Sequence, residues 1–406
     1  MTAFALTEAQ RAFADQVRSI AADELRPIAE AGPPGHVNRE LIKAMGELGL
    51  LRRLFPGMAG DALSREAAAT DLCLLREALA TQSTDAETAL ALQGLGAYPI
   101  LQSGPEDTVR RWLPAVAAGD AVAAFALTEP EAGSDAAALS LRAEADGDDW
   151  RLTGEKTWIS NAPEADVYTV FARTTPDAGA RGVSAFAVPG DRHGLRGEHL
   201  DMISPHPIGR LTFDGVRVDR TELLGEPDRG FRVAMRTLDL FRPSVGAFAV
   251  GMAQAATDAA VAHAGTRIAF GGPLKDQQAV AHLLAEMATR TEAARLLVYA
   301  AAAAYDASAG PGPGGGAGAG PGPGAGPGGG AGAGAAGRIA AKSAMAKLFA
   351  TETAQFVVDA AVQIHGARAL RRGHLLEHLY REVRAPRIYE GASEVQRTII
   401  ARDLYR

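Results

Sequence analysis

The spacing of apolar residues changes twice along this 406-residue chain, and those changes constrain its fold more than any other feature. Over residues 1–120 the apolar residues follow helical spacing, interrupted by prolines and glycines. Strand-like runs then replace that spacing, and it returns after Gly230. We therefore expect an α+β protein with a helical domain at 1–120, a β-barrel or β-sandwich domain at 121–226 and a helical domain at 227–406.

Individual elements follow from the same patterns. Two apolar runs, 167–171 and 182–188, predict strands that are buried on both faces. The pair Asp214-Gly215 stands between two short alternating runs and predicts a β-hairpin with a type I′ turn. Helices are expected at about 38–50, 64–80, 85–95, 106–118, 232–264 and 277–307.

One segment has a composition of its own, because residues 309–337 are only glycine, alanine and proline. Such a segment cannot bury a core and is expected to form a flexible, solvent-exposed insertion. Helix is expected to resume at Arg338, and the two helices that flank the insertion are expected to pack antiparallel.

Charge and cysteine content narrow the class of protein. Lys and Arg number 41 against 48 Asp and Glu, a net charge of −7 without a block of like charge, which argues against nucleic-acid or anionic-membrane partners. The single cysteine, Cys73, excludes an intrachain disulfide framework and is expected in the core. With no signal peptide and no apolar stretch of about 18 residues recognised, we expect a soluble, cytoplasmic protein.

Two places in the sequence have the S/T-x-x-Q spacing of a helix capping box: Thr7 with Gln10, and Ser393 with Gln396. The second lies in RIYEGASEVQR, residues 387–397, where Glu390 precedes Gly391 just before the predicted helix. A carboxylate held there is suited to act as a base on a substrate, while the first amides of the helix hold an anionic or carbonyl group. An ordinary capped surface helix explains the same spacing.

Four further blocks combine polar groups, glycines and aromatic residues in ways that suit a bound ligand. For each, a structural turn, a buried tryptophan or a surface loop is the alternative. The four blocks are LTEPEAGSD at 127–135, GEKTWISNA at 154–162, LDLFRP at 238–243 and RIAFGGPLKDQQ at 267–278. A fifth, shorter segment is QIHG at 363–366.

Taken together and in this order, these blocks resemble the signatures of the acyl-CoA dehydrogenase family, over nearly the whole chain except 309–337. The resemblance implies an N-terminal helical domain, a middle β domain and a C-terminal four-helix bundle. It implies FAD as cofactor, with Glu390 as the catalytic base. Phe241 occupies the alternative position of the base, which leaves Glu390 as the candidate. Ala367 replaces the second glycine that usually follows QIHG.

The resemblance also assigns binding residues. Substrate would contact Ser134, Asp239, Arg242, Tyr389 and Gly391. FAD would contact Phe125, Leu127, Thr128, Gly133, Ser134, Trp158, Ile159, Ser160, Arg267, Phe270, Gln277, Gln278, Gln363, Ile364, Gly366, Ala392, Ser393 and Glu394.

The implied reaction removes an α-proton and a β-hydride from an acyl-CoA thioester and leaves a trans-2-enoyl thioester. The implied partners are an electron-transfer flavoprotein and further copies of the chain, as a dimer or tetramer. Three alternatives stay open: a dehydrogenase of carrier-protein-bound acyl groups, a flavin oxidase or monooxygenase, and a catalytically silent helical scaffold.

Histidines give little indication of a metal site. His374 and His378 are four residues apart on a predicted helix, and His365 is the nearest third ligand in sequence. Solvated surface histidines explain this spacing, so no metal is expected.

Overall fold

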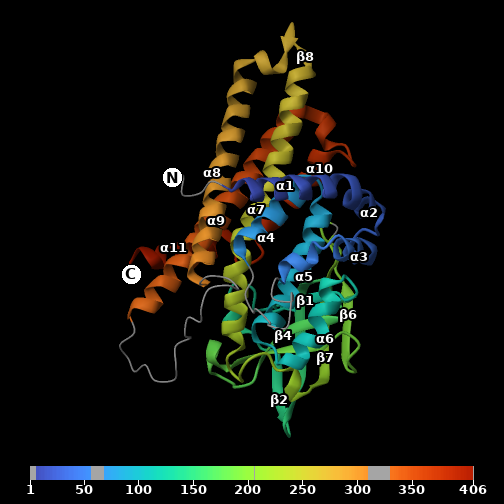
Figure 1. Cartoon of the computed structure of the whole chain (residues 1–406), viewed down its shortest axis with the longest axis vertical. Coiled ribbons are helices and arrows are strands. Elements are labelled where there is room, and N and C mark those ends of the chain that lie inside the picture. The colour runs from blue at the N-terminus through green and yellow to red at the C-terminus, as the bar shows by residue number, and fades with distance from the viewer. Residues whose placement is uncertain (1–5, 56–67, 205, 310–329, 406) are drawn as a thin grey trace. The chain divides into compact units, whose positions relative to one another are not determined.

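The computed structural model describes residues 6–55, 68–204, 206–309 and 330–405 (Figure 1). The chain divides into two compact units. Unit 1 comprises Met1–Ala21, Ala68–Thr84 and Asp239–Arg406, and unit 2 comprises Ala22–Ala67 and Asp85–Leu238. These units group the chain differently from the expected domains, so the boundaries at 120 and 226 stay predictions.

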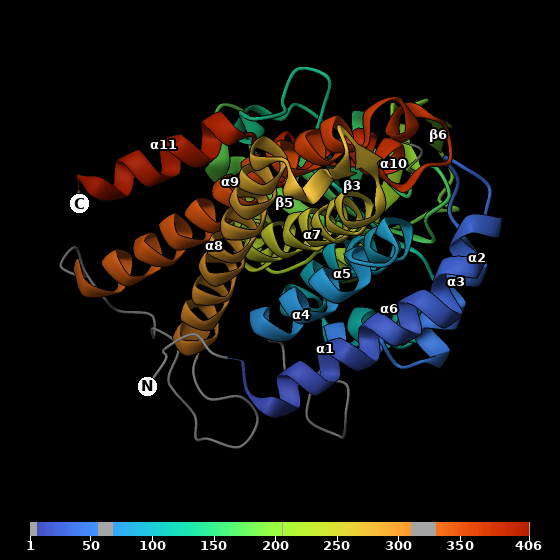
Figure 2. The same cartoon turned by 90° about the horizontal axis from the view of Figure 1, so that it is seen from above.

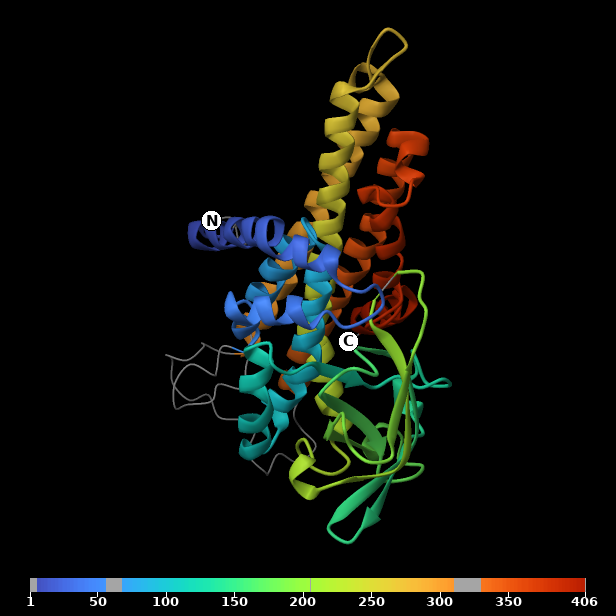
Figure 3. The same cartoon turned by 90° about the vertical axis from the view of Figure 1, so that its right-hand side faces the viewer.

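Unit 2 is built on a curled seven-stranded sheet (Figure 3). The strand order is β1-β4-β2-β3-β7-β6, and β5 pairs with β4. The strands are β1 (Ala123–Ala126), β2 (Arg142–Asp146), β3 (Asp149–Ser160), β4 (Val167–Arg173), β5 (Val183–Pro189), β6 (Leu195–His199) and β7 (Ile208–Val218). As predicted, β4 and β5 are buried along both faces, because nearly all their side chains are apolar.

The predicted hairpin at Asp214-Gly215 is wrong. β7 continues through this pair as one strand and is bonded to β3 on one side and β6 on the other. Gly215 has φ 63°, and the register with β3 shifts there, so the glycine forms a β-bulge rather than a turn. Partners on both sides hold the strand in place and outweigh the local turn preference.

In the described part of unit 2, four α-helices accompany the sheet. They are α2 (Arg26–Ala31), α3 (Arg39–Glu47), α5 (Thr84–Ser103, whose first residue belongs to unit 1) and α6 (Glu106–Ala117). Asn38 caps α3 by accepting a hydrogen bond from the Leu41 amide. Helix α3 buries the apolar side chains at 41, 42 and 45, as its spacing predicts.

Unit 1 is helical. Its elements are α1 (Glu8–Ile20), α4 (Ala69–Ala80), most of α7 (Gly230–Thr266), β8 (Ile268–Ala269), β9 (Gly272–Pro273), α8 (Gln278–Ala309), α9 (Gly330–His365), α10 (Leu375–Glu382) and α11 (Ser393–Leu404). The capping box of Thr7 and Gln10 is confirmed. Helix α9 packs against α8, α10 and α11 (Figure 2), and α8 and α9 run in opposite directions, as expected for the helices beside the insertion.

The insertion is shorter than its composition suggested. Ala309 ends α8, and α9 begins at Gly330 rather than Arg338, so 330–337 are helical. Alanines, the strongest helix formers, alternate with glycine there and continue the following helix by one to two turns. Residues 310–329 lie outside the described part of the chain.

Helix α7 contains an apolar window that is long enough to cross a membrane, which the sequence analysis did not recognise. The window has a mean hydropathy of 1.3, but 72% of it is buried inside the protein. Its apolar residues therefore form core contacts.

Candidate active site

The predicted site residues lie in both compact units, and each part has its own local construction. Phe125, Leu127, Thr128, Gly133, Ser134, Trp158, Ile159 and Ser160 belong to unit 2. The other predicted residues, including Glu390, belong to unit 1.

In unit 2, β3 presents an exposed tryptophan. Between Lys156 and Ile159 the register of β3 with β7 shifts, and Trp158 lies in this bulge with φ 58° and 55% of its surface exposed. A left-handed backbone is unfavourable for such a large residue and turns the side chain out of the regular alternation. Ile159 is 1% exposed, which favours a packing role for its side chain.

The loop after β1 is held against β3 by a buried network. The Lys156 ammonium lies 2.8 Å from Glu129 Oε1 and donates to the Leu127 carbonyl at 2.8 Å. Burial lowers the pKa of Lys156 to about 8, although Glu129 opposes that shift. Burial also disfavours the Glu129 carboxylate, but Lys156 and the amides of Ser140 and Leu141 lower its pKa overall.

This network fixes one end of the predicted cofactor segment. The Thr157 amide donates to the Thr128 carbonyl at 3.0 Å, which joins the loop to the strand that carries Trp158. The side chain of Phe125 lies beside Phe171, with ring centroids 4.9 Å apart. Gly133 and Ser134 are exposed on the same loop. Lys156 and Glu129 were not predicted as site residues. The available indication was that each is a charged residue inside one of the two motifs, at 154–162 and 127–135.

In unit 1, Glu390 lies between the 3-10 turn Ala385–Arg387 and α11. Glu390 and Gly391 have φ values of 51° and 95°, so two successive residues are left-handed. The residue is partly exposed, but its carboxylate atom Oε2 is buried and has no hydrogen-bond partner among the described residues. Burial raises the pKa of Glu390, and the cations Arg76, Lys347 and Arg242 oppose that shift.

Three side chains hold the backbone carbonyls of this turn. Lys347 Nζ donates to the Gly391 carbonyl at 2.7 Å, and Gln396 Nε2 donates to it at 2.8 Å. Arg242 Nε and Gln396 Nε2 lie 3.5 and 3.3 Å from the Glu390 carbonyl. Burial lowers the pKa of Lys347 to about 8 against the opposing charge of Glu390. The sequence analysis missed Lys347 as a member of this site.

Arg242, a predicted substrate residue, is mainly paired within the protein. Its Nη1 donates to Asp239 Oδ1 at 2.9 Å, with side chains 7% and 33% exposed. Burial raises the pKa of Asp239, and Arg242 opposes the shift. Tyr389 is 37% exposed beside Glu390.

The predicted capping box at Ser393 and Gln396 is wrong. Ser393 is 4% exposed and donates from Oγ to Glu352 at 2.7 Å, while Ala392 is the N-cap residue of α11 without a side-chain cap. Burial disfavours the Glu352 carboxylate, but Ser393 and Arg387 lower its pKa. Gln396 is committed to the carbonyls of the Glu390 turn. Partners distant in sequence thus outweigh the local motif.

The remaining predicted cofactor residues lie at one end of the helical unit. Arg267 lies between the end of α7 and a two-stranded hairpin formed by β8 and β9. The turn residues of this hairpin, Phe270 and Gly271, have φ values of 53° and 86°. Phe270 is 93% exposed and Arg267 is exposed. Gln277 precedes α8 and Gln278 begins it. Gln363 and Ile364 lie in the last turn of α9, and Gly366 begins the 3-10 turn that follows.

The ends of α7 and α9 meet through two histidines. The rings of His263 and His365 stack with centroids 4.2 Å apart. Burial lowers the pKa of His263, and His365, Arg368 and Arg267 lower it further. Of the histidines for which no metal was expected, His378 is hydrogen-bonded to Thr84 at 2.5 Å and His374 accepts from the Leu376 amide. Their hydrogen bonds therefore go to different protein groups.

The residues present fit a dinucleotide flavin. Its ring system needs a flat apolar wall, which Trp158 offers, and its diphosphate needs a cation, which exposed Arg267 offers.

Comparison with known proteins gives the class and then the family. Models of the acyl-CoA dehydrogenase N-terminal, middle and C-terminal domains match residues 7–120, 124–216, and 228–319 with 330–405. A probable acyl-CoA dehydrogenase, fadE25, of Mycobacterium bovis is 35% identical over 99% of this chain and 97% of its own. The cyclohexane-1-carbonyl-CoA dehydrogenase of Geobacter metallireducens is 31% identical over 99% of each chain.

The solved butyryl-CoA dehydrogenase of Megasphaera elsdenii has a TM-score of 0.86 and 30% identity over 99% of this chain and 100% of its own. The matched family models and relatives show an FAD-dependent oxidoreductase with N-terminal helices, a middle curled sheet and C-terminal helices. The chain belongs to the acyl-CoA dehydrogenase family. The predicted cofactor, fold class and enzyme class are thereby confirmed.

Proposed function

We propose that this protein oxidises an acyl-CoA thioester to the trans-2-enoyl-CoA, with Glu390 as the base that removes the α-proton. Acyl-CoA dehydrogenation in general follows from the family. The observation that supports the base is the Glu390 carboxylate itself, whose Oε2 is buried and has no hydrogen-bond partner among the described residues. A carboxylate oxygen without a hydrogen-bond partner among the described residues is available to a substrate proton.

The surroundings of Glu390 suit this role. Its pKa is raised by burial, which makes it a stronger base once ionised and brings its pKa closer to the operating pH. Lys347 and Arg242 counter that shift, while their hydrogen bonds hold the turn. The first amides of α11, at residues 393 and 394, lack intrahelical acceptors and are suited to polarise a carbonyl.

FAD, when bound, supplies the acceptor for the hydride that leaves the β-carbon. We propose that the predicted residues around Trp158 hold its ring system and that Arg267 binds its diphosphate. The segment at Gln363–Gly366, joined to the end of α7 by the stacked histidines, would contact the adenine side. Ser134, Asp239 and Tyr389 stay predicted substrate contacts.

We further propose that electrons leave to an electron-transfer flavoprotein and that the protein is a cytoplasmic homo-oligomer, a dimer or tetramer. The family resemblance supports both partners. Phe270 supports the oligomer, because an aromatic side chain 93% exposed at a hairpin tip is suited to contact a second subunit. The absence of cysteine other than buried Cys73 supports a reducing compartment.

For the acyl group, we propose a short, branched or cyclic chain. Phe241, which is 2% exposed, fills space on α7 that a smaller residue would leave open. The relatives named for butyryl and cyclohexane-1-carbonyl groups are consistent with that choice.

The test is an anaerobic titration of the FAD-loaded protein with butyryl-, isovaleryl-, cyclohexane-1-carbonyl- and palmitoyl-CoA, followed by the visible flavin absorbance. We expect bleaching by at least one of the first three and little by palmitoyl-CoA. Bleaching only by an acyl carrier protein would instead identify a carrier-bound substrate. Flavin that no thioester reduces, but that consumes oxygen with an external reductant, would favour a monooxygenase.

A further inference from the structure

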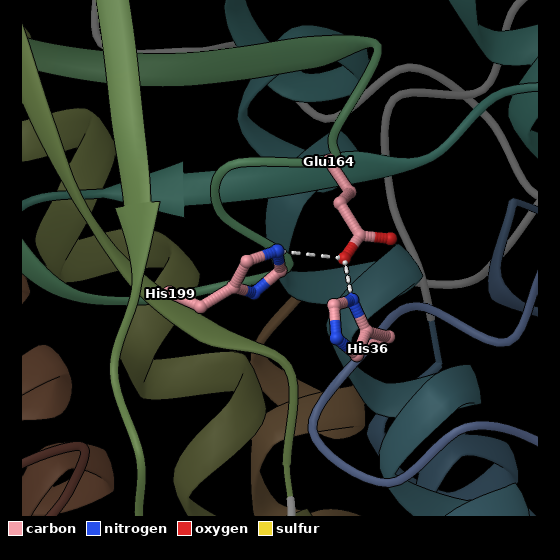
Figure 4. A group of neighbouring side chains, drawn as sticks. All are labelled: His36, Glu164 and His199. Atoms are coloured by element: carbon pink, nitrogen blue, oxygen red, sulfur yellow. Dashed lines mark hydrogen bonds and ion pairs between the residues drawn. The ribbon is translucent and has the colours of Figure 1, made fainter.

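Three side chains that take no part in the proposed reaction converge on the surface of unit 2 (Figure 4). His36 lies in the loop between α2 and α3, Glu164 in the loop between β3 and β4, and His199 is the last residue of β6. Glu164 Oε1 lies 2.8 Å from His36 Nδ1 and 3.1 Å from His199 Nε2. The three ligand atoms all lie within 4.8 Å of one another.

Neighbouring backbone holds each member of this cluster in place. The second oxygen of Glu164 accepts a hydrogen bond from the Val37 amide at 3.2 Å, so the carboxylate is oriented by the residue next to His36. The Glu164 amide donates to the Asn161 carbonyl at 2.9 Å. His199 is paired with Gly209 in the β6–β7 ladder. Backbone hydrogen bonds therefore help to hold Glu164 and His199 in position within the cluster.

The chemistry and spacing of these atoms fit a transition metal. Zinc binds imidazole nitrogen at about 2.0–2.1 Å and carboxylate oxygen at about 2.0–2.2 Å, so tetrahedral ligand atoms lie roughly 3.4 Å apart. The Glu164–His36 and Glu164–His199 separations of 2.8 and 3.1 Å would need to widen by roughly 0.6 and 0.3 Å. Imidazole favours zinc over magnesium or calcium, and a fully oxygen-lined site would be needed for the latter.

The charge around the cluster also suits a cation. Arg39 is the nearest cation on α3 and binds the Glu164 carbonyl at 2.8 Å, but its guanidinium is paired with Asp166 at 2.8 Å. The side chains of His36, Glu164 and His199 are 50%, 27% and 36% exposed, so an ion can reach them from solvent.

We propose that His36, Glu164 and His199 bind one zinc ion, with a fourth position open to water. The ion would join the α2–α3 loop to the β3–β4 loop and to the end of β6. Glu164 and His199 lie 128 and 163 residues after His36 in the sequence. Binding to this folded arrangement and not to the unfolded chain stabilises unit 2. The site is independent of the proposed reaction.

The test is calorimetric titration of chelator-treated, FAD-loaded protein with zinc chloride, together with metal analysis after dialysis. We expect one zinc per chain and no comparable binding of magnesium. His36→Ala, His199→Ala and Glu164→Gln should each weaken zinc binding at least ~10-fold, the low end for perturbing a metal site. His193→Ala, an exposed histidine in the same unit, is the matched control and should bind zinc as the parent does.

The flavin content of each variant, determined without zinc, shows whether it folds. If His199→Ala does not fold, His199→Gln is used in its place. Absence of saturable zinc binding by the parent protein would overturn the proposal, leaving the cluster as a pair of hydrogen bonds. Zinc binding that survives in the combined His36→Ala and His199→Ala variant would also overturn it.

Discussion

Lys156 and Glu129 form an ion pair of 2.8 Å whose side chains are 0% and 3% exposed. The same carboxylate accepts hydrogen bonds from the amides of Ser140 and Leu141, at 2.6 and 2.9 Å. The loop after β1 is therefore folded around a buried charge pair, and every oxygen of that pair has a donor. Removing one partner leaves the other charge buried and uncompensated.

Lys156→Met should thus reduce the free energy of unfolding by about 3–5 kcal/mol. It should also lower FAD content, because the loop and Trp158 lose their common support. Urea unfolding and the flavin-to-protein absorbance ratio measure the two effects. The control is Arg196→Met, which breaks an exposed pair with Asp214 (side chains 72% and 70% exposed) and should cost about 0–1 kcal/mol. Equal losses in both variants would contradict the prediction.

Glu390→Gln should retain FAD but lose at least ~10²-fold in the rate of flavin reduction by substrate, the low end for general base catalysis. Stopped-flow reduction measures it. Glu8→Gln, at the exposed first residue of α1 in the same unit and outside the predicted site, is the control and should keep the parent rate. A near-normal rate for Glu390→Gln would remove this residue from the role of base.

The same variant should be more stable than the parent at neutral pH. Because the folded pKa of Glu390 is raised, the folded state binds its proton more tightly than the unfolded state does. Stability is therefore lost as pH rises from the unfolded pKa through the folded one, and Glu390→Gln avoids that loss. The gain should be roughly 1.4 kcal/mol per unit of pKa elevation and should disappear below the unfolded pKa. Urea unfolding at several pH values checks the sign.

Gly391→Ala should disturb the Glu390 turn. Gly391 has φ 95°, and an added Cβ would lie 2.6 Å from Gln396 Nε2, which holds the turn carbonyls. Gly373→Ala is the control, since its φ is 81° but nothing lies within 4 Å of the added Cβ. Both should lose about 1–2 kcal/mol from backbone strain. Only Gly391→Ala should also lose turnover, measured as kcat, and equal activity in both would refute the assigned role of Gln396.

Lys347→Met should move the pH dependence of the reaction. Loss of this cation leaves Glu390 in an even less favourable place for its charged form, so its pKa rises further. The midpoint of the kcat/KM profile should therefore shift to higher pH. Lys342→Met, exposed on the same helix, should leave the midpoint unchanged. A lower rate with an unchanged midpoint would assign Lys347 a purely structural role.

The fold was largely predictable because the spacing of apolar residues distinguishes its helices from its strands. Continuous apolar runs gave β4 and β5, and helical spacing gave α7 and α8. Predictions failed where hydrogen-bond partners distant in sequence outweigh the preference of a local motif. Gly215 lies in a strand bonded on both sides, and Ser393 bonds Glu352, 41 residues earlier, rather than its own helix.

The candidate site shows the same limit. Motifs pointed to Glu390 and Trp158, whose local sequences are distinctive. Lys347 and the Lys156–Glu129 pair were missed because their importance comes from partners 44 and 27 residues away. His36, Glu164 and His199 are further apart still, and only the folded sheet brings them together.

The bulge at Trp158 has a consequence for how this domain can change in length. Its extra residue reverses which face the following side chains occupy, so deleting one residue there would exchange the faces of the last two residues of β3, Ile159 and Ser160. Ile159, now 1% exposed, would be turned toward water. We therefore expect this domain to tolerate insertions and deletions outside Lys156–Ile159 and not within it.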